Sequence, residues 1–174
     1  MNIIALLGRS RVGKDTAATI LSKAFGFHIL RLSSPIKDAC SVLYDIPRER
    51  LDSSHKEIVD PRYGRTPRDL MVQMTAVVRA GVPSDFFVTR LMSRAKPPGI
   101  IIPDVRYQED VDVLKTHDAL VLKITRADAP VLHAHEDPID SMNADVVFKN
   151  DDDLCIFEKR ILCFAEHIKA AGWK

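Results

Sequence analysis

The sequence contains few of the features that mark secreted, membrane-spanning or metal-binding proteins. Its three cysteines, Cys40, Cys155 and Cys163, form no CxxC pair and have no metal-ligand spacing. An odd number of cysteines without a secretion signal favours buried thiols in a reducing cytosol over disulfides. No apolar run is long enough to span a bilayer, and the apolar N-terminus reaches Arg9 and Arg11 too early for a signal peptide. We therefore expect a cytoplasmic protein with no membrane partner.

The chain also lacks a large excess of positive or negative charge, since its formal net charge is +1 over 174 residues. Such a balance gives no electrostatic surface for a nucleic-acid polymer, and it disfavours a nucleic-acid-binding ATPase. Positive residues are nevertheless concentrated between residues 62 and 79, where Asp69 is the one acidic residue. The arginines of this stretch are Arg62, Arg65, Arg68 and Arg79. Their clustering suits a few phosphate groups on a small molecule better than a long polyanion.

Short apolar segments alternate with amphipathic ones along the chain. The spacing predicts strands over residues 2–7, 27–32, 100–102, 119–125 and 145–149. It predicts helices over residues 14–25, 34–44, 67–80, 84–95, 106–117 and 152–171. Residues 46–65 are polar and punctuated by prolines, which indicates an irregular insertion. The alternation favours an α/β fold whose parallel sheet is covered by helices on both faces.

A glycine-containing loop joins the first predicted strand to the first predicted helix, and its sequence from Gly8 to Thr16 is GRSRVGKDT. Glycines let backbone N–H groups turn inward around phosphate oxygens, and the helix dipole favours the negative charge. Lys14 would place a cation on the β- and γ-phosphates of ATP. We expect this loop to bind ATP through Arg11, Val12, Gly13, Lys14, Asp15 and Thr16.

The position after the loop lysine departs from the usual pattern. A serine or threonine normally stands there and helps to hold Mg²⁺, whereas this chain has Asp15, with Thr16 one position later. We therefore expect Thr16, or water held by Asp15 or Asp104, to take that role. The alternative for Asp104 is an N-cap of the helix that starts near Arg106.

Five segments of the chain have specific sequences, namely GKDT at 13–16, LSSPIKDA at 32–39, RDLM at 68–71, IPDVR at 102–106 and DVVFKND at 145–151. These segments resemble those of phage-type and viral-type deoxynucleoside monophosphate kinases. They occur in order over nearly the whole chain, and GKDT and PIKDA are the most specific. The resemblance implies a P-loop kinase-type three-layer αβα fold with a five-stranded parallel sheet in the order 2-3-1-4-5.

The same resemblance implies a division of the chain. It implies a single kinase domain over residues 1–174, with a helical acceptor-binding insertion at 46–96 and a short lid at 127–144. His133 and Glu136 are similar to a lid signature of the family. Residues 127–147 contain no Lys or Arg, so a lid full of arginines of the adenylate kinase type is excluded.

Phosphoryl transfer depends mainly on cations placed around the transferring group. We expect Lys14 and Arg126 to be catalytic, although Arg126 at a strand end is also explained as an exposed charge. Arginine grips phosphate with a planar, two-pronged fork. With the resemblance, the expected acceptor-binding residues are Ser10, Ile36, Lys37, Arg68, Arg79, Asp104, Arg106 and Asp110. Asn150 and Asp151 would cap the last helix, and the resemblance places Asn150 near the adenine of ATP.

The expected activity is transfer of the γ-phosphoryl group of ATP to a deoxynucleoside monophosphate. The expected cofactors are ATP and Mg²⁺, and the expected partners are small nucleotides, with a homodimer also compatible with the sequence. A viral protein of this kind would act in the host cytoplasm. Animal phosphomevalonate kinases share parts of the pattern, which leaves a similar small-molecule kinase as an alternative. A non-catalytic regulatory module would bind ATP through the same loop but lack the acceptor site.

Overall fold

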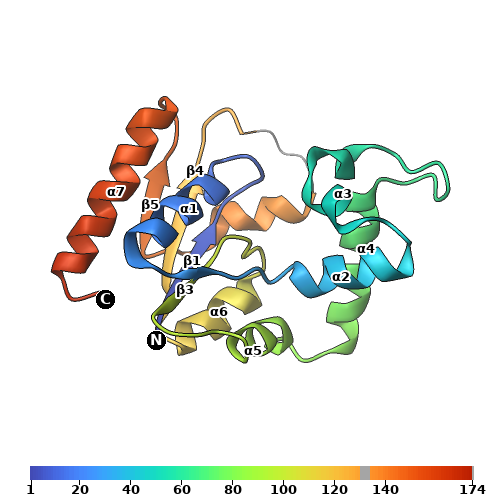
Figure 1. Ribbon diagram of the computed structural model, residues 1–174, viewed down its shortest axis with the longest axis horizontal. Coiled ribbons are helices and arrows are strands. Elements are labelled where there is room, and N and C mark those ends of the chain that lie inside the picture. Colours follow the sequence, from blue (N-terminus) through green and yellow to red (C-terminus); the bar gives the residue numbers. More distant parts are fainter. Residues whose placement is uncertain (130–133, 174) are drawn as a thin grey trace. The chain divides into compact units, whose positions relative to one another are not determined.

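The protein is described by a computed structural model that covers residues 1–129 and 134–173, with only the backbone described for residues 134–137. The chain divides into two compact units (Figure 1). The first unit contains residues 1–32 and 87–174, and the second contains residues 33–86. None of the helices in the described residues is long and apolar enough to cross a membrane.

A parallel five-stranded sheet forms the centre of the first unit. Its strands are β1 (Asn2–Leu7), β2 (His28–Ile29), β3 (Gly99–Ile102), β4 (Leu120–Thr125) and β5 (Val146–Lys149). They lie in the order β2-β3-β1-β4-β5, and each neighbouring pair is parallel. The central strand β1 is buried from Ile3 to Leu7, which explains its unbroken apolar sequence. The predicted αβα fold with the order 2-3-1-4-5 is confirmed.

One face of the sheet is covered by two helices that pack on each other, α1 (Lys14–Phe25) and α7 (Leu154–Ala170) (Figure 1). The helix side of this core comes from alanine and large apolar residues at helical spacing, such as Ala17 and Leu21 of α1 and Phe157 of α7. The sheet contributes alternate residues of β1, β3 and β4, and the whole cluster is almost fully buried. This packing fixes the start of α1 relative to the end of β1.

The remaining helices of the first unit are α5 (Phe86–Met92), of which all but Phe86 belongs to this unit, and α6 (Gln108–Thr116). Right-handed connections from β1 to β2 and from β3 to β4 run in opposite directions across the sheet, so they place α1 and α6 on opposite faces. Apolar side chains of α5 and α6, including Val88 and Leu114, are completely buried. A 3-10 helix, η2 (Ala134–Ser141), lies between β4 and β5.

The second unit is helical and contains α2 (Ser34–Leu43), α3 (Arg48–Asp52), the 3-10 helix η1 (Ser54–Glu57) and α4 (Pro67–Gly81). Helix α4 starts with a capping box, in which Thr66 and Asp69 satisfy each other's backbone N–H groups. The prediction of an irregular stretch at 46–65 is wrong for α3 and η1, because buried Ile46 and Leu51 anchor this segment.

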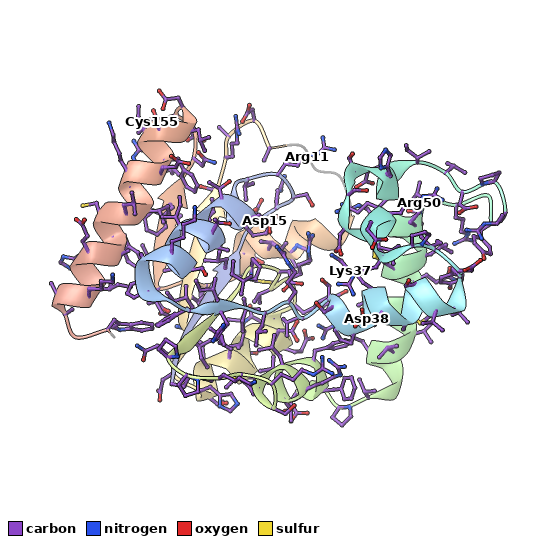
Figure 2. The ribbon with its side chains drawn as sticks, in the orientation of Figure 1. Arg11, Asp15, Lys37, Asp38, Arg50 and Cys155 are labelled. Carbon is purple, nitrogen blue, oxygen red and sulfur yellow. The ribbon has the colours of Figure 1, made fainter. Side chains whose placement is uncertain are left out.

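Three local predictions also need correction. Strand β2 has two residues instead of six. Helix α7 is capped by Asp153, whose carboxylate accepts from the Ile156 N–H, and not by Asn150 or Asp151. Cys40 is buried, which raises the pKa of its thiol to about 11. The other two cysteines, Cys155 (Figure 2) and Cys163, are exposed on α7 outside its apolar face.

A buried carboxylate joins two parts of the second unit. Asp60 is 1% exposed and accepts hydrogen bonds from the side chains of Arg62 and Arg50 and from the backbone N–H of Arg62. The hydrogen bonds and charge of Arg62, aided by the charge of Arg50, hold the pKa of Asp60 far below its usual range despite its burial. Asp60 also pairs with Arg65 across a short antiparallel bridge, so it fixes the loop before α4.

The substitution Asp60→Asn tests this carboxylate. Because the folded-state pKa of Asp60 is depressed, its contribution to the free energy of unfolding is full above about pH 4, the pKa of an unfolded aspartate, and is lost as the pH falls below that value. We expect the variant to have a lower free energy of unfolding than the wild type at pH 7. As the pH falls from about 5 to about 2, the free energy of unfolding should decrease less in the variant than in the wild type. Urea unfolding over this pH range measures both effects.

Asp45→Asn is the matched control, because the Asp45 side chain is fully exposed and lies 3.8 Å from Arg62. Its pH dependence of unfolding should follow that of the wild type. Equal curves for the Asp60 and Asp45 variants would contradict the assignment.

Candidate active site

The glycine loop between β1 and α1 adopts backbone conformations that few residues allow. Gly8, Arg11 and Gly13 have φ values of 144°, 64° and 103°. A Cβ on Gly8 would lie 2.4 Å from the carbonyl oxygen of Ile124, so the loop leaves β1 too close to β4 for any side chain. A sharp turn of this kind directs backbone N–H groups into a common concavity, which is the requirement for binding phosphate.

Lys14 occupies the first position of the 12-residue helix α1 and is 8% exposed. Its ammonium group donates to the carbonyl oxygens of Gly8 at 2.7 Å and Arg9 at 2.5 Å. The lysine therefore reaches back over the loop, with the positive end of the α1 dipole behind it. A cation and a helix N-terminus at one place favour an anionic ligand.

Asn150 supports the loop from the other side. It follows β5, is 7% exposed, and donates from its side-chain Nδ2 to the carbonyl oxygen of Val12 at 2.9 Å. A Cβ on Gly13 would lie 2.7 Å from the same Nδ2 atom. Asn150 was predicted to bind ATP near the adenine, and in the structure its amide is engaged with the loop backbone.

The two residues after the lysine have different surroundings. Asp15 is exposed and pairs with Arg31 at 2.6 Å, whereas Thr16 is half-buried in the first turn of α1. Figure 2 shows Arg11 on the loop and Asp15 at the start of α1. Asp104, at the carboxyl end of β3, accepts from the backbone N–H of Leu32 at 2.9 Å.

The structure corrects the alternative assignment of Asp104 as a helix cap, because the N-cap position of α6 is Tyr107. The Asp104 carboxylate instead joins the segments that follow β2 and β3. Two hard oxygen groups thus lie just beyond carboxyl ends of strands, the Thr16 hydroxyl in the first turn of α1 and the Asp104 carboxylate after β3, and such groups are suitable ligands for Mg²⁺.

A cavity of about 430 Å³ opens beside the loop in the first unit. It is lined by residues of the loop (Gly8, Arg9, Val12), of β4 and the segment after it (Lys123 to Ala127, and Ala129), of η2 (Ile139, Asp140) and of β5 (Val147). The predicted catalytic residue Arg126 lines this cavity together with Gly8, and its guanidinium pairs with Asp128 at 2.9 Å. The lining thus combines cationic groups with apolar side chains.

Two cations at this cavity were not predicted. Arg9 pairs with Asp140 of η2 at 2.5 Å, and Lys123 is 8% exposed and donates to the backbone carbonyl of Asp140 at 2.8 Å. A lysine inside the apolar strand sequence LVLKIT was a usable signal for Lys123, because lysine is rarely buried without a specific partner. Nothing in the local sequence indicated Arg9, whose partner lies 131 residues away.

Three predicted acceptor-binding residues besides Asp104 belong to the first unit. Arg106 donates from its guanidinium to the hydroxyl of Ser10 at 3.4 Å, which brings the loop and the segment after β3 together. Ser10 is 7% exposed. Asp110 is buried in the first turn of α6, at 1% exposure.

The other predicted acceptor-binding residues belong to the second unit. Lys37 of α2 pairs with Asp52 at 2.6 Å, and Arg68 of α4 pairs with Glu57 at 2.6 Å. The two cations are largely buried, with side-chain exposures of 14% and 15%. Burial raises the pKa of Asp52, but the hydrogen bonds and charges of Lys37 and Arg48 outweigh it and lower that pKa overall.

Ile36 is buried in α2, and Arg79 lies half-buried in the last turn of α4. Figure 2 shows Lys37 on α2 within this unit. The predicted lid residue His133 lies outside the described residues, and the side chain of Glu136 is likewise not described.

The sheet order and the loop together define an α/β fold of the P-loop kinase type, with the glycine loop at the carboxyl end of its central strand. A protein of Acanthamoeba polyphaga mimivirus, provisionally named a deoxynucleotide monophosphate kinase, is 29% identical over 144 residues. The match covers 72% of this chain and 75% of that protein. The resemblance predicted from the sequence motifs is confirmed by this relative.

No family model matches the sequence. Among solved structures, shikimate kinase from Aquifex aeolicus is 17% identical, with a TM-score of 0.48 over 98% of this chain and 99% of that one. TT1252 from Thermus thermophilus is 18% identical, with a TM-score of 0.49 over 95% of this chain and 97% of that one.

The two glycines that flank α1 provide a test of the loop geometry. Both have positive φ, but a Cβ on Gly13 would meet Asn150, whereas a Cβ on Gly26 would meet nothing within 4 Å. We expect Gly26→Ala to cost about 1 kcal/mol of stability from backbone strain alone. Gly13→Ala should cost roughly 2–4 kcal/mol, because a close contact adds to the strain.

Urea or thermal unfolding of the two variants measures this difference. Equal losses of stability would show that Asn150 does not press against the loop at Gly13.

Proposed function

We propose that the protein is an ATP-dependent kinase that transfers the γ-phosphoryl group to a deoxynucleoside monophosphate, giving ADP and a deoxynucleoside diphosphate. The observation that carries the proposal is the sharply turned glycine loop, with positive φ at Gly8, Arg11 and Gly13, that leads into the buried Lys14 at the start of α1. The viral relative's name supports a deoxynucleotide as the acceptor.

The donor side of the reaction would use the loop of the first unit. Backbone N–H groups of residues 11–16 would bind the β- and γ-phosphates, and the Lys14 ammonium would exchange its bonds to the Gly8 and Arg9 carbonyls for phosphate oxygens. Arg126 would add a second cation to the transferring group. Because the carboxylate that pairs with Arg126 is an exposed side chain, exchanging this partner for phosphate costs little.

Each unit contains residues that we propose for the acceptor. In the first unit these are Arg106, Ser10, which accepts from the Arg106 guanidinium, and Asp110. In the second unit they are Lys37 and Arg68. The pairs Lys37–Asp52 and Arg68–Glu57 hold the two second-unit cations in defined positions before a ligand arrives. Ile36 would supply an apolar contact, and Arg79 a further cation.

The domain boundaries remain part of this proposal. The acceptor-binding segment would fall within residues 46–96, together with Lys37 on α2, and the lid would fall within residues 127–144. Of the proposed lid, residues 138–142 include Ile139 and Asp140, which line the cavity beside the loop. That contact supports a role of this segment in covering the bound nucleotide.

Thr16 and Asp104 would hold Mg²⁺, either directly or through water. Their hydroxyl and carboxylate oxygens fit the preference of this ion for hard oxygen ligands. The ion would neutralise charge on the phosphates when bound. The substitution of Asp15 for the usual hydroxyl residue is compatible with this assignment, because Asp15 forms an ion pair with Arg31.

The acceptor is tested with a panel of deoxynucleoside and ribonucleoside monophosphates, using coupled detection of ADP release. We expect turnover with at least one deoxynucleoside monophosphate, because the proposed cations recognise a phosphate ester on a nucleoside. Turnover with phosphomevalonate alone would favour the phosphomevalonate kinase alternative. Binding of ATP without transfer to any acceptor would favour the regulatory module.

Lys14→Met tests the donor site. Removing the ammonium leaves the developing charge on the γ-phosphoryl group uncompensated, and we expect a loss of about 100-fold or more in kcat. The matched control is Lys23→Met, an exposed lysine in the last turn of the same helix, which should keep wild-type kinetics. Near-normal kcat for the Lys14 variant would contradict its assigned role.

A further inference from the structure

The turn after β5 contacts the glycine loop through a side chain that is not needed to cap α7. Asn150 donates from Nδ2 to the Val12 carbonyl at 2.9 Å, and this bond joins residues 138 positions apart. The helix cap is supplied independently by Asp153. Asn150 is a buried polar residue whose side-chain amide bonds to the loop backbone, so its substitution should act first on the loop.

The turn that carries Asn150 is itself fixed at two points. The backbone N–H of Asn150 donates to the Thr125 carbonyl at 2.8 Å, which continues the pairing of β4 with β5. The carboxylate of Asp151 accepts from the backbone N–H of Ala127 at 2.7 Å. Asn150 is therefore presented to the loop from a rigid element, and its amide has little freedom to choose another partner.

The contact acts on the part of the loop that would meet phosphate. Val12 is two residues before Lys14, and Gly13, between them, lies so close to Asn150 that a Cβ would be 2.7 Å from Nδ2. The peptide joining Val12 to Gly13 is thus held by its carbonyl oxygen on one side. Because a peptide is planar, holding its carbonyl also fixes the direction of the Gly13 N–H.

We propose that Asn150 is a positioning residue of the nucleotide site, which orients the Val12–Gly13 peptide so that its N–H faces the bound phosphates. This inference rests on the proposed function. It differs from the assignment of Asn150 as an adenine contact, because it predicts a role for the residue that depends on the phosphates and not on the base.

Asn150→Ala and Asn150→Asp test the proposal. Alanine removes the donor, and aspartate in addition places a carboxylate oxygen against the Val12 carbonyl. Loss of one hydrogen bond that holds the loop should weaken binding by about tenfold for alanine, and by more for aspartate. Calorimetric titration of the whole protein with ATP and, separately, with inorganic triphosphate in the presence of Mg²⁺ measures this loss.

The two probes separate a phosphate-directed role from a base-directed one. If Asn150 positions the loop, its substitution lowers the affinities for ATP and for inorganic triphosphate by the same factor, since both ligands bind through the loop. If Asn150 instead contacts adenine, its substitution lowers the affinity for ATP and leaves the affinity for triphosphate unchanged. That result would overturn the inference. Unchanged affinity for both probes would overturn it as well.

Asp153→Ala is the matched control for a loss of stability alone. It removes the N-cap of α7 three residues further along, so it should lower the melting temperature while leaving both affinities at wild-type values. A wild-type protein that binds neither probe would contradict the proposed function itself. A wild-type protein that binds both, with an equal loss of affinity in the Asn150 and Asp153 variants, would contradict only the positioning role.

Discussion

The close approach of the glycine loop to the sheet and to the turn after β5 is the constraint on which the site depends. Gly8 leaves β1 where a Cβ would be 2.4 Å from the Ile124 carbonyl, and Gly13 enters α1 where a Cβ would be 2.7 Å from Asn150. Between these points the chain turns with positive φ at Arg11. The buried sheet and α7 hold both contacts in place, so the core of the first unit shapes the loop directly.

Electrostatic pairing is the second theme of the structure. In the first unit, the Lys14 ammonium donates to the backbone carbonyls of Gly8 and Arg9, and Arg126 pairs with the exposed carboxylate of Asp128. In the second unit, Lys37 and Arg68 are paired with carboxylates. A phosphate that binds there must compete with Asp52 and Glu57, which favours ligands of high charge density over weakly charged ones.

Much of the fold could be predicted from local sequence, because the responsible forces are local. The apolar run of β1 and the helical spacing after Lys14 indicated a buried strand and its following helix, and the motifs indicated the sheet order. The prolines in residues 46–65 obscured α3, whose Leu51 is held by tertiary packing. The bonds from Asn150 to Val12 and from Arg9 to Asp140 join distant residues, so no local pattern reveals them.

Phosphorus-31 NMR of the protein with MgATP and a deoxynucleoside monophosphate tests the central claim most directly. We expect the γ-phosphorus signal of ATP to disappear as the β-phosphorus signal of a deoxynucleoside diphosphate grows in equal amount. Conversion of the γ-phosphoryl group to inorganic phosphate, or an unchanged ATP spectrum with every acceptor, would contradict it.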